Sequence, residues 1–312
     1  MRKEFETYMS EIVLSMKGIT KVYGGVKALD NVSIQINRGE IYGLIGNNGA
    51  GKTTLMRLIA GHSVSYQGVI SLFGAPTKGD TRKNRVRTGV LIEEPGFFHN
   101  MTATQNLEYF RVQFGIPGKS ITSKIISDVG LLNADHRKYK DFSLGMKQRL
   151  GIGLALLNSP EFLILDEPIN GLDPAGIIEI RQILLDVNKK NNTTILISSH
   201  ILAEISNIAT KYGFLSHGNL LEEISADALA KKCNCYLDIT VENVEKMCLL
   251  LEKELHFINY KVYPNQHIHL YEGLDKGDKI CQLAVTHQVG LSEIHTRVIN
   301  LENYYMSMVE GK

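Results

Sequence analysis

The chain carries a glycine-rich segment that can bind phosphate, Gly46-Asn47-Asn48-Gly49-Ala50-Gly51-Lys52-Thr53. It follows an apolar run and opens a predicted helix over 53–60. Glycines let the backbone curl so that successive N–H groups point at phosphate oxygens, and a helix N-terminus favours negative charge. Lys52 supplies a cation for the terminal phosphates, and Thr53 supplies a hydroxyl for Mg²⁺. The segment, with the adjoining Thr54, therefore predicts a nucleoside triphosphate site.

Two carboxylates end a second apolar run farther along the chain. The run 162–165 predicts a strand buried on both faces of a parallel sheet, and Asp166 and Glu167 follow it. We expect Asp166 to hold Mg²⁺, mostly through water, because this small cation keeps much of its hydration shell. Glu167 can then polarise the water that attacks the terminal phosphate. The alternative is a salt-bridged strand end without a catalytic role.

The elements that must position these groups form an α/β domain with a parallel sheet and a helical insertion. Apolar and alternating runs predict strands, and apolar residues at helical spacing predict the insertion. The predicted strands are 12–16, 32–36, 41–45, 162–165 and 195–197, and the predicted helices of the insertion are 105–114, 120–131 and 144–157.

A different pattern follows residue 220. Its order is β-α-β-β-α-β, which predicts a small ferredoxin-like α+β unit. The strands are predicted at 237–241, 257–263, 267–271 and 292–299, and the helices at 244–255, 277–288 and 301–308. We therefore divide the chain into an unpatterned tail (1–11), a nucleotide-binding domain (12–222, with a helical subdomain at about 96–160) and a C-terminal accessory domain (232–312). His267 and His269 alternate with apolar residues, which favours a solvated strand face over a metal site.

The amino-acid composition indicates a globular protein and gives no sign of a membrane span. The 312 residues are 44% hydrophobic and 21% charged, which is typical of a globular protein with two domains. A formal net charge of +1 favours neither a nucleic acid nor an anionic membrane as partner. No apolar run approaches the roughly 20 residues of a membrane span. All four cysteines lie in the last third, and we expect them to be reduced in the cytosol.

The segment Ser143-Leu144-Gly145-Met146-Lys147-Gln148-Arg149 resembles the signature motif of ABC transporter ATPase subunits, and residues 12–220 are similar to that family throughout. The resemblance implies a P-loop NTPase fold of the ABC type. It also implies that Tyr23 stacks on adenine and that His200 contacts the γ-phosphate. Ser143 is a good helix N-cap. With Gly145 it is implied to present backbone donors to the ATP of an opposite subunit.

Three residues depart from the family pattern. Leu144 replaces the first glycine of the usual Leu-Ser-Gly-Gly-Gln motif, and Met146 replaces its glutamine. Glu93 stands where most relatives have a glutamine. A carboxylate there can still ligate Mg²⁺, but it adds negative charge near the γ-phosphate. Slower or differently coupled hydrolysis is compatible with this change, and loss of activity does not follow from it.

The runs 91–97, 143–150 and 301–307 further resemble the ATPases of bacitracin-resistance and lantibiotic-immunity exporters. The resemblance implies a cytoplasmic subunit, peripheral at the inner face of the cell membrane, that binds ATP and Mg²⁺ and drives a separately encoded permease. One P-loop and one signature favour a homodimer with ATP at its interface.

Two alternatives lie outside transport. A soluble ABC ATPase acting on ribosomes or DNA would carry two such domains or a long coiled coil, and neither is present, so we expect no nucleic-acid partner. A regulatory nucleotide switch is favoured by Glu93 and Leu144 but opposed by the intact Glu167.

Overall fold

The computed structural model describes residues 12–77, 82–232, 235–298, 304–306 and 308. The boundary between two compact units falls between Ala226 and Asp227, within the stretch 223–231 that lies between the two predicted domains. No helix in the described ranges is both long and apolar enough to cross a bilayer.

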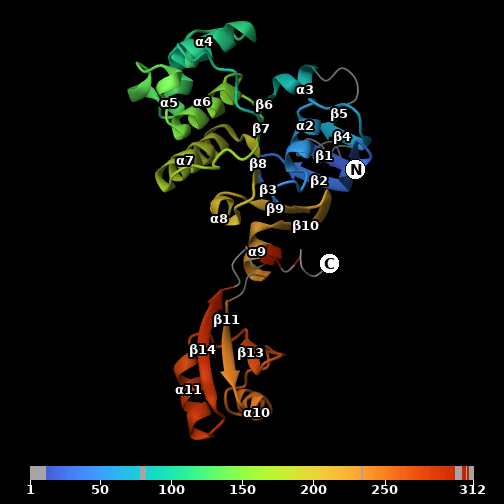
Figure 1. Ribbon diagram of the computed structural model, residues 1–312, viewed down its shortest axis with the longest axis vertical. Coiled ribbons are helices and arrows are strands. Elements are labelled where there is room, and N and C mark those ends of the chain that lie inside the picture. The colour runs from blue at the N-terminus through green and yellow to red at the C-terminus, as the bar shows by residue number, and fades with distance from the viewer. Residues whose placement is uncertain (1–11, 78–81, 233–234, 299–303, 307, 309–312) are drawn as a thin grey trace, which may run out of the picture. The chain divides into compact units, whose positions relative to one another are not determined.

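A six-stranded sheet forms the centre of the first unit (Figure 1). Its strand order is β10-β9-β3-β8-β7-β6, and all neighbours are parallel except β10, which pairs antiparallel with β9. The strands are β3 (Ile41–Ile45), β6 (Thr88–Leu91), β7 (Phe162–Leu165), β8 (Thr194–Ser199), β9 (Lys211–Ser216) and β10 (Asn219–Ser225). β3, β7 and β8 are buried throughout, as their apolar sequences predict.

An antiparallel sheet of order β2-β1-β4-β5 lies beside it. Its strands are β1 (Ile12–Tyr23), β2 (Val26–Asn37), β4 (Gln67–Leu72) and β5 (Ala75–Pro76). The prediction ended the first strand at residue 16, but β1 continues to Tyr23 through register shifts on either side of Gly18. These irregularities break the alternation by which a strand is recognised, so the extension was missed.

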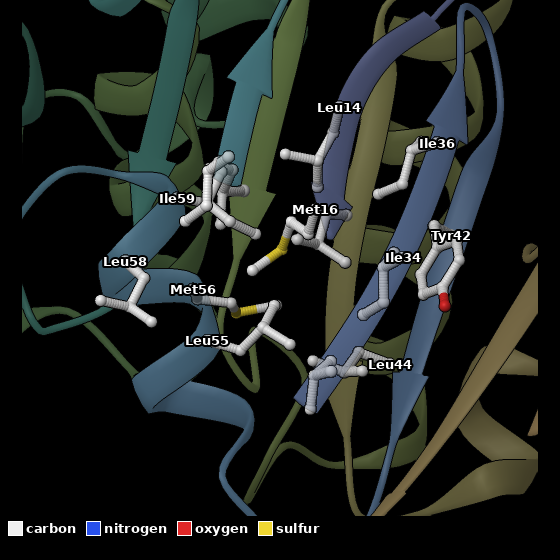
Figure 2. Close-up of a cluster of buried hydrophobic side chains, with 14 of the residues drawn as sticks. Leu14, Met16, Ile34, Ile36, Tyr42, Leu44, Leu55, Met56, Leu58 and Ile59 are labelled. Carbon is white, nitrogen blue, oxygen red and sulfur yellow. The ribbon is translucent and has the colours of Figure 1, made fainter. Parts of the chain in front are cut away.

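The main core lies where this sheet meets β3 and the helix α2 (Lys52–Ile59). Figure 2 shows side chains from all three converging on one apolar cluster. Burying one leucine or isoleucine contributes about 1.5–3 kcal/mol. This cluster therefore anchors the helix that begins at Lys52. Its labelled members are Leu14, Met16, Ile34, Ile36, Tyr42, Leu44, Leu55, Met56, Leu58 and Ile59.

The predicted helical insertion is present. After α3 (Arg82–Val86) it comprises α4 (Ala103–Gln113), α5 (Ser120–Asp128), η1 (Leu132–Ala134), η2 (Tyr139–Asp141) and α6 (Leu144–Leu156), and α4, α5 and α6 lie together in Figure 1. Thr102 and Gln105 form a reciprocal capping box at the start of α4. The longer α7 (Pro174–Asn191) and the short α8 (Leu202–Ile205) complete the unit.

The second unit has the predicted order β-α-β-β-α-β, preceded by α9 (Ala226–Lys232). Its elements are β11 (Cys235–Val241), α10 (Val244–Glu254), β12 (Tyr260–Tyr263), β13 (His267–Leu270), α11 (Gly277–Thr286) and β14 (Leu291–Val298). The sheet order is β12-β13-β11-β14, and every neighbouring pair is antiparallel. Much of the predicted helix 301–308 lies outside the described residues.

One predicted strand of this unit is shorter than expected. The prediction began it at Phe257, but β12 starts at Tyr260. The backbone N–H groups of Ile258 and Asn259 donate to the Glu272 carboxylate at 2.5 and 2.6 Å. Because this side chain takes the donors that a strand ladder would use, the ladder starts later.

Candidate functional site

The phosphate-binding segment leaves the buried end of β3 and leads directly into α2. Gly49 and Gly51 have φ angles of 81° and 110°, which favour glycine. A Cβ atom at Gly51 would lie 2.7 Å from the carbonyl oxygen of Ala28. The curl is closed by a hydrogen bond of 3.0 Å from the Ala50 N–H to the carbonyl of Asn47. The glycines therefore permit the tight turn that a phosphate cradle requires.

Lys52 lies in the interior of this curl and is only 6% exposed. Its ammonium donates to the carbonyl oxygens of Gly46, at 2.6 Å, and Asn47, at 3.3 Å. It also lies 3.1 Å from Oε1 of Glu167. The predicted phosphate-binding cation and the predicted catalytic carboxylate are thus direct neighbours.

Asp166 is held by two hydroxyl groups. Thr53 Oγ1 donates to Oδ2 at 2.6 Å, and Ser198 Oγ donates to Oδ1 at 2.5 Å. The register of the parallel strands explains the second contact. Leu165 of β7 pairs with Ile197 of β8, so the residues that follow them, Asp166 and Ser198, lie side by side. Thr53 and Asp166 form an oxygen-only donor set, which is the kind that Mg²⁺ prefers. The residues present therefore fit the predicted metal.

Glu167 connects the remaining catalytic candidates. Its Oε2 lies 2.8 Å from Nδ1 of His200, and its backbone N–H donates to Ser198 Oγ at 2.9 Å. Its φ of 49° is unusual for a residue with a side chain, and such backbone conformations are concentrated at functional sites. Lys52, Glu167 and His200 consequently form one contact chain beside Thr53 and Asp166.

Glu93 is placed differently. Its carboxylate is 69% exposed and lies 2.6 Å from the guanidinium of Arg57 on α2. It also lines, with Asp166, a cavity of about 320 Å³. The Thr53–Asp166 contact is formed without Glu93, and its role as a Mg²⁺ ligand stays a prediction.

The neighbouring Glu94 turns toward the helical part. The Tyr139 hydroxyl donates to its carboxylate at 3.0 Å. Burial, with this hydrogen bond, raises the pKa of the Tyr139 phenol well above its ordinary value. Both residues line the cavity that Glu93 shares with Asp166. Adjacent carboxylates thus contact α2 on one side and the segment before the signature on the other.

The remaining predicted residues make contacts outside the Lys52–Glu167 chain. Tyr23 ends β1 with 47% of its surface exposed. Ser143 caps α6 as predicted, because its Oγ accepts from the Met146 N–H at 3.3 Å. A Cβ atom at Gly145 would meet the Leu172 side chain at 3.8 Å. The roles predicted for these residues toward adenine and an opposite ATP stay predictions.

The sequence interpretation missed Ser198. The segment around His200 was recognised, but no function was given to this hydroxyl, which contacts both Asp166 and Glu167. Its position at the end of an apolar strand, like that of Asp166, is the signal that could have found it. Arg57 and Lys21 were missed as well.

The histidine pair of the second unit contacts a carboxylate. Asp238 Oδ1 lies 2.9 Å from His267 Nδ1 and 3.6 Å from His269 Nε2. Burial lowers the pKa of His269. Within the described ranges, no group of three or more His, Cys, Asp or Glu side chains is arranged to hold a metal ion.

Comparison with known proteins agrees with this geometry. The family model described as ABC transporter matches residues 29–170. The chain is 38% identical over 299 residues to the bacitracin transport ATP-binding protein BcrA of Bacillus licheniformis, covering 96% of this chain and 98% of that protein. It is 41% identical over 215 residues to the lantibiotic transport ATP-binding protein SrtF of Streptococcus pyogenes, covering 69% and 92%.

A solved structure gives the same assignment. An ATP-binding cassette of an ABC transporter in its ADP conformation matches with 26% identity and a TM-score of 0.64. The match covers 71% of this chain and 94% of that one. The chain therefore belongs to the family of ABC transporter ATP-binding proteins.

Proposed function

We propose that this chain hydrolyses ATP at the Lys52–Glu167 site as a homodimer and thereby drives a separately encoded membrane permease. The observation that carries the proposal is the convergence on Glu167. One carboxylate oxygen meets the Lys52 ammonium and the other meets His200, beside the Thr53–Asp166 contact. A regulatory switch without turnover has no need of such a carboxylate, so these contacts favour hydrolysis.

The roles follow from the positions. The glycine-rich backbone and Lys52 bind the phosphates of ATP. Glu167 accepts the proton of the water that attacks the γ-phosphorus, and ADP and phosphate are the products. His200 holds the Glu167 carboxylate through its 2.8 Å contact. Thr53 and Asp166 would hold Mg²⁺, which neutralises charge on the phosphate oxygens when it is bound.

The dimer is inferred from the signature helix. Ser143 and Gly145 stand at the N-terminus of α6, where backbone donors and the helix dipole attract an anion. Their contacts are separate from the phosphate-binding segment of the same chain. We assign these donors to the ATP of a second copy, which makes two composite sites per homodimer.

The cargo is proposed from the relatives. Similarity to a bacitracin transport protein extends over 96% of the chain, and similarity to a lantibiotic transport protein over 69%. We therefore propose export of, or self-protection against, a peptide antibiotic, by a subunit bound at the cytoplasmic face of the membrane. No nucleic-acid role is proposed.

The experiment is a deletion of the encoding gene in its host, complemented with wild type or with Glu167→Gln. Bacitracin and a lantibiotic are tested separately, with an antibiotic of unrelated chemistry as the control. We expect the deletion to sensitise the host to one peptide antibiotic, and only the wild type to restore resistance. Unchanged sensitivity to both would contradict the proposed cargo. Copurification of a membrane protein from detergent extract would test the permease partner.

The C-terminal domain (232–312) is proposed to serve dimer assembly or regulation. The second unit has its own apolar core, so it can be an independent module. Truncation after Ser225 is expected to preserve ATP binding and to alter dimerisation or stimulation by the permease. A truncated protein that matches the full chain in ATP affinity, dimerisation and coupled transport would refute a regulatory role.

A further inference from the structure

Lys21 places a buried ammonium group against the ring of Tyr23. The two residues lie two positions apart near the end of β1. The ammonium is 4.5 Å from the centroid of the Tyr23 ring. It also donates to the carbonyl oxygen of Ser65 at 2.6 Å, and Lys21 is only 6% exposed. The ammonium is therefore fixed between a carbonyl oxygen and the face of an aromatic ring.

This arrangement is unusual for a buried cation. Buried charges are normally paired with an opposite charge, because leaving water is costly. In the described part of the chain, Lys27, Lys52, Lys190 and Lys211 form ion pairs with carboxylates, but Lys21 does not. Its partners are one neutral carbonyl and one ring. The Tyr23 ring therefore stabilises the charge of Lys21, and the same contact restricts the movement of the ring.

We propose that Lys21 is a positioning residue for adenine, acting through Tyr23. The inference rests on the proposed function, in which Tyr23 stacks on the base of ATP. Lys21 fixes the ring plane from one side, and the 47% exposure of Tyr23 leaves surface on which a purine can stack. A cation on one face also draws electron density from the ring, which favours stacking of an electron-rich purine on the other face.

The contact with Ser65 holds the Lys21 ammonium from a second segment of the chain, 44 positions away. Ser65 lies in the segment between α2 and β4, and α2 begins at Lys52. Lys21 thus connects the end of β1, where the base would stack, to the segment that follows the phosphate-binding helix.

The test compares two ligands that differ in the base. Binding of ATP and of inorganic tripolyphosphate to the full-length protein is measured by calorimetry for wild type, Lys21→Met and Lys21→Arg. We expect Lys21→Met to weaken ATP about 3- to 10-fold and to leave tripolyphosphate unchanged, since only ATP uses the ring. Lys21→Arg keeps a cation over the ring, so it should retain most of the wild-type difference between the affinities for ATP and for tripolyphosphate.

Controls separate positioning from a structural effect. Lys17→Met removes an exposed lysine from the same strand and should change neither affinity. In a Tyr23→Leu background, Lys21→Met should have no further effect on ATP binding. Parallel losses for both ligands, or an undiminished loss in the Tyr23→Leu background, would overturn the inference. If Lys21→Met does not fold, Lys21→Gln keeps a donor for Ser65 without the charge, and it should weaken ATP alone.

Failure of this inference is distinguishable from failure of the proposed function. Lys52→Ala should weaken both ATP and tripolyphosphate, because it removes the cation that meets the phosphates. If Lys52→Ala has this effect and Lys21→Met does not discriminate between the ligands, only the role of Lys21 is refuted. If Lys52→Ala changes neither affinity, the phosphate site itself is wrongly assigned.

Discussion

Replacing Ser198 with alanine should disturb both carboxylates of the site at once. The fully buried hydroxyl donates to Asp166 at 2.5 Å and accepts from the Glu167 N–H at 2.9 Å. A hydrogen bond to a charged group contributes about 1.5–3 kcal/mol, and a buried N–H left without a partner costs about 1–3 kcal/mol. Partial relaxation makes the two effects less than additive. We expect Ser198→Ala to lower the free energy of unfolding by about 2–4 kcal/mol.

The assay is urea unfolding followed by circular dichroism, with the rate of ATP hydrolysis measured at increasing Mg²⁺ concentration. Turnover should fall, and more Mg²⁺ should be needed, because Asp166 and Glu167 are less firmly oriented. Ser199→Ala is the matched control: this adjacent buried hydroxyl contacts Ile201 and Glu204 instead. Wild-type stability and Mg²⁺ dependence in Ser198→Ala would refute the reasoning.

Three further predictions concern single charges. Lys52→Ala should lower turnover as well as ATP affinity, and unchanged ATP affinity in calorimetry would contradict the assigned cradle. Glu93→Gln should raise the hydrolysis rate by removing negative charge near the γ-phosphate. The melting temperature should change little, because the ion pair of Glu93 with Arg57 is exposed. A slower rate of hydrolysis would argue that the carboxylate is a Mg²⁺ ligand. Hydrogen bonds from Arg87, then Arg38, lower the pKa of Glu161 to about 2 from an ordinary value of 4.5. The contribution of Glu161 to the free energy of unfolding is therefore present above pH 4.5 and is lost as the pH falls toward 2. Glu161→Gln should have a lower melting temperature than wild type at pH 7 and the same melting temperature near pH 2. A difference in melting temperature that stays constant with pH would refute this.

The strands and helices that carry the site were largely predictable from local sequence. The apolar runs of β3 and β7 are buried throughout, so their composition alone indicated parallel strands. The glycines before Lys52 and the carboxylates after β7 then followed at the ends of those strands. The capping role of Ser143 was predictable for the same reason, because it depends on a residue three positions away.

Contacts between distant segments were not predictable in this way. Arg57 and Glu93 are 36 positions apart, and nothing in either segment indicates the pairing. The contact between Ser198 and Asp166 depends on the register of β7 and β8, which only the assembled sheet defines. The same holds for Lys21, because its ammonium donates to the carbonyl oxygen of Ser65, which is 44 positions away.

The central claim is that Glu167 activates the water that hydrolyses ATP, and it is tested most directly by the turnover of Glu167→Gln. The variant keeps the size of the side chain and removes its basicity, so we expect ATP binding to persist and turnover to fall about 10²- to 10⁴-fold. Size-exclusion chromatography with ATP should then show a stable dimer. Glu161→Gln, at the opposite end of β7, is the matched control and should hydrolyse ATP normally. Near-normal turnover of Glu167→Gln would contradict the account.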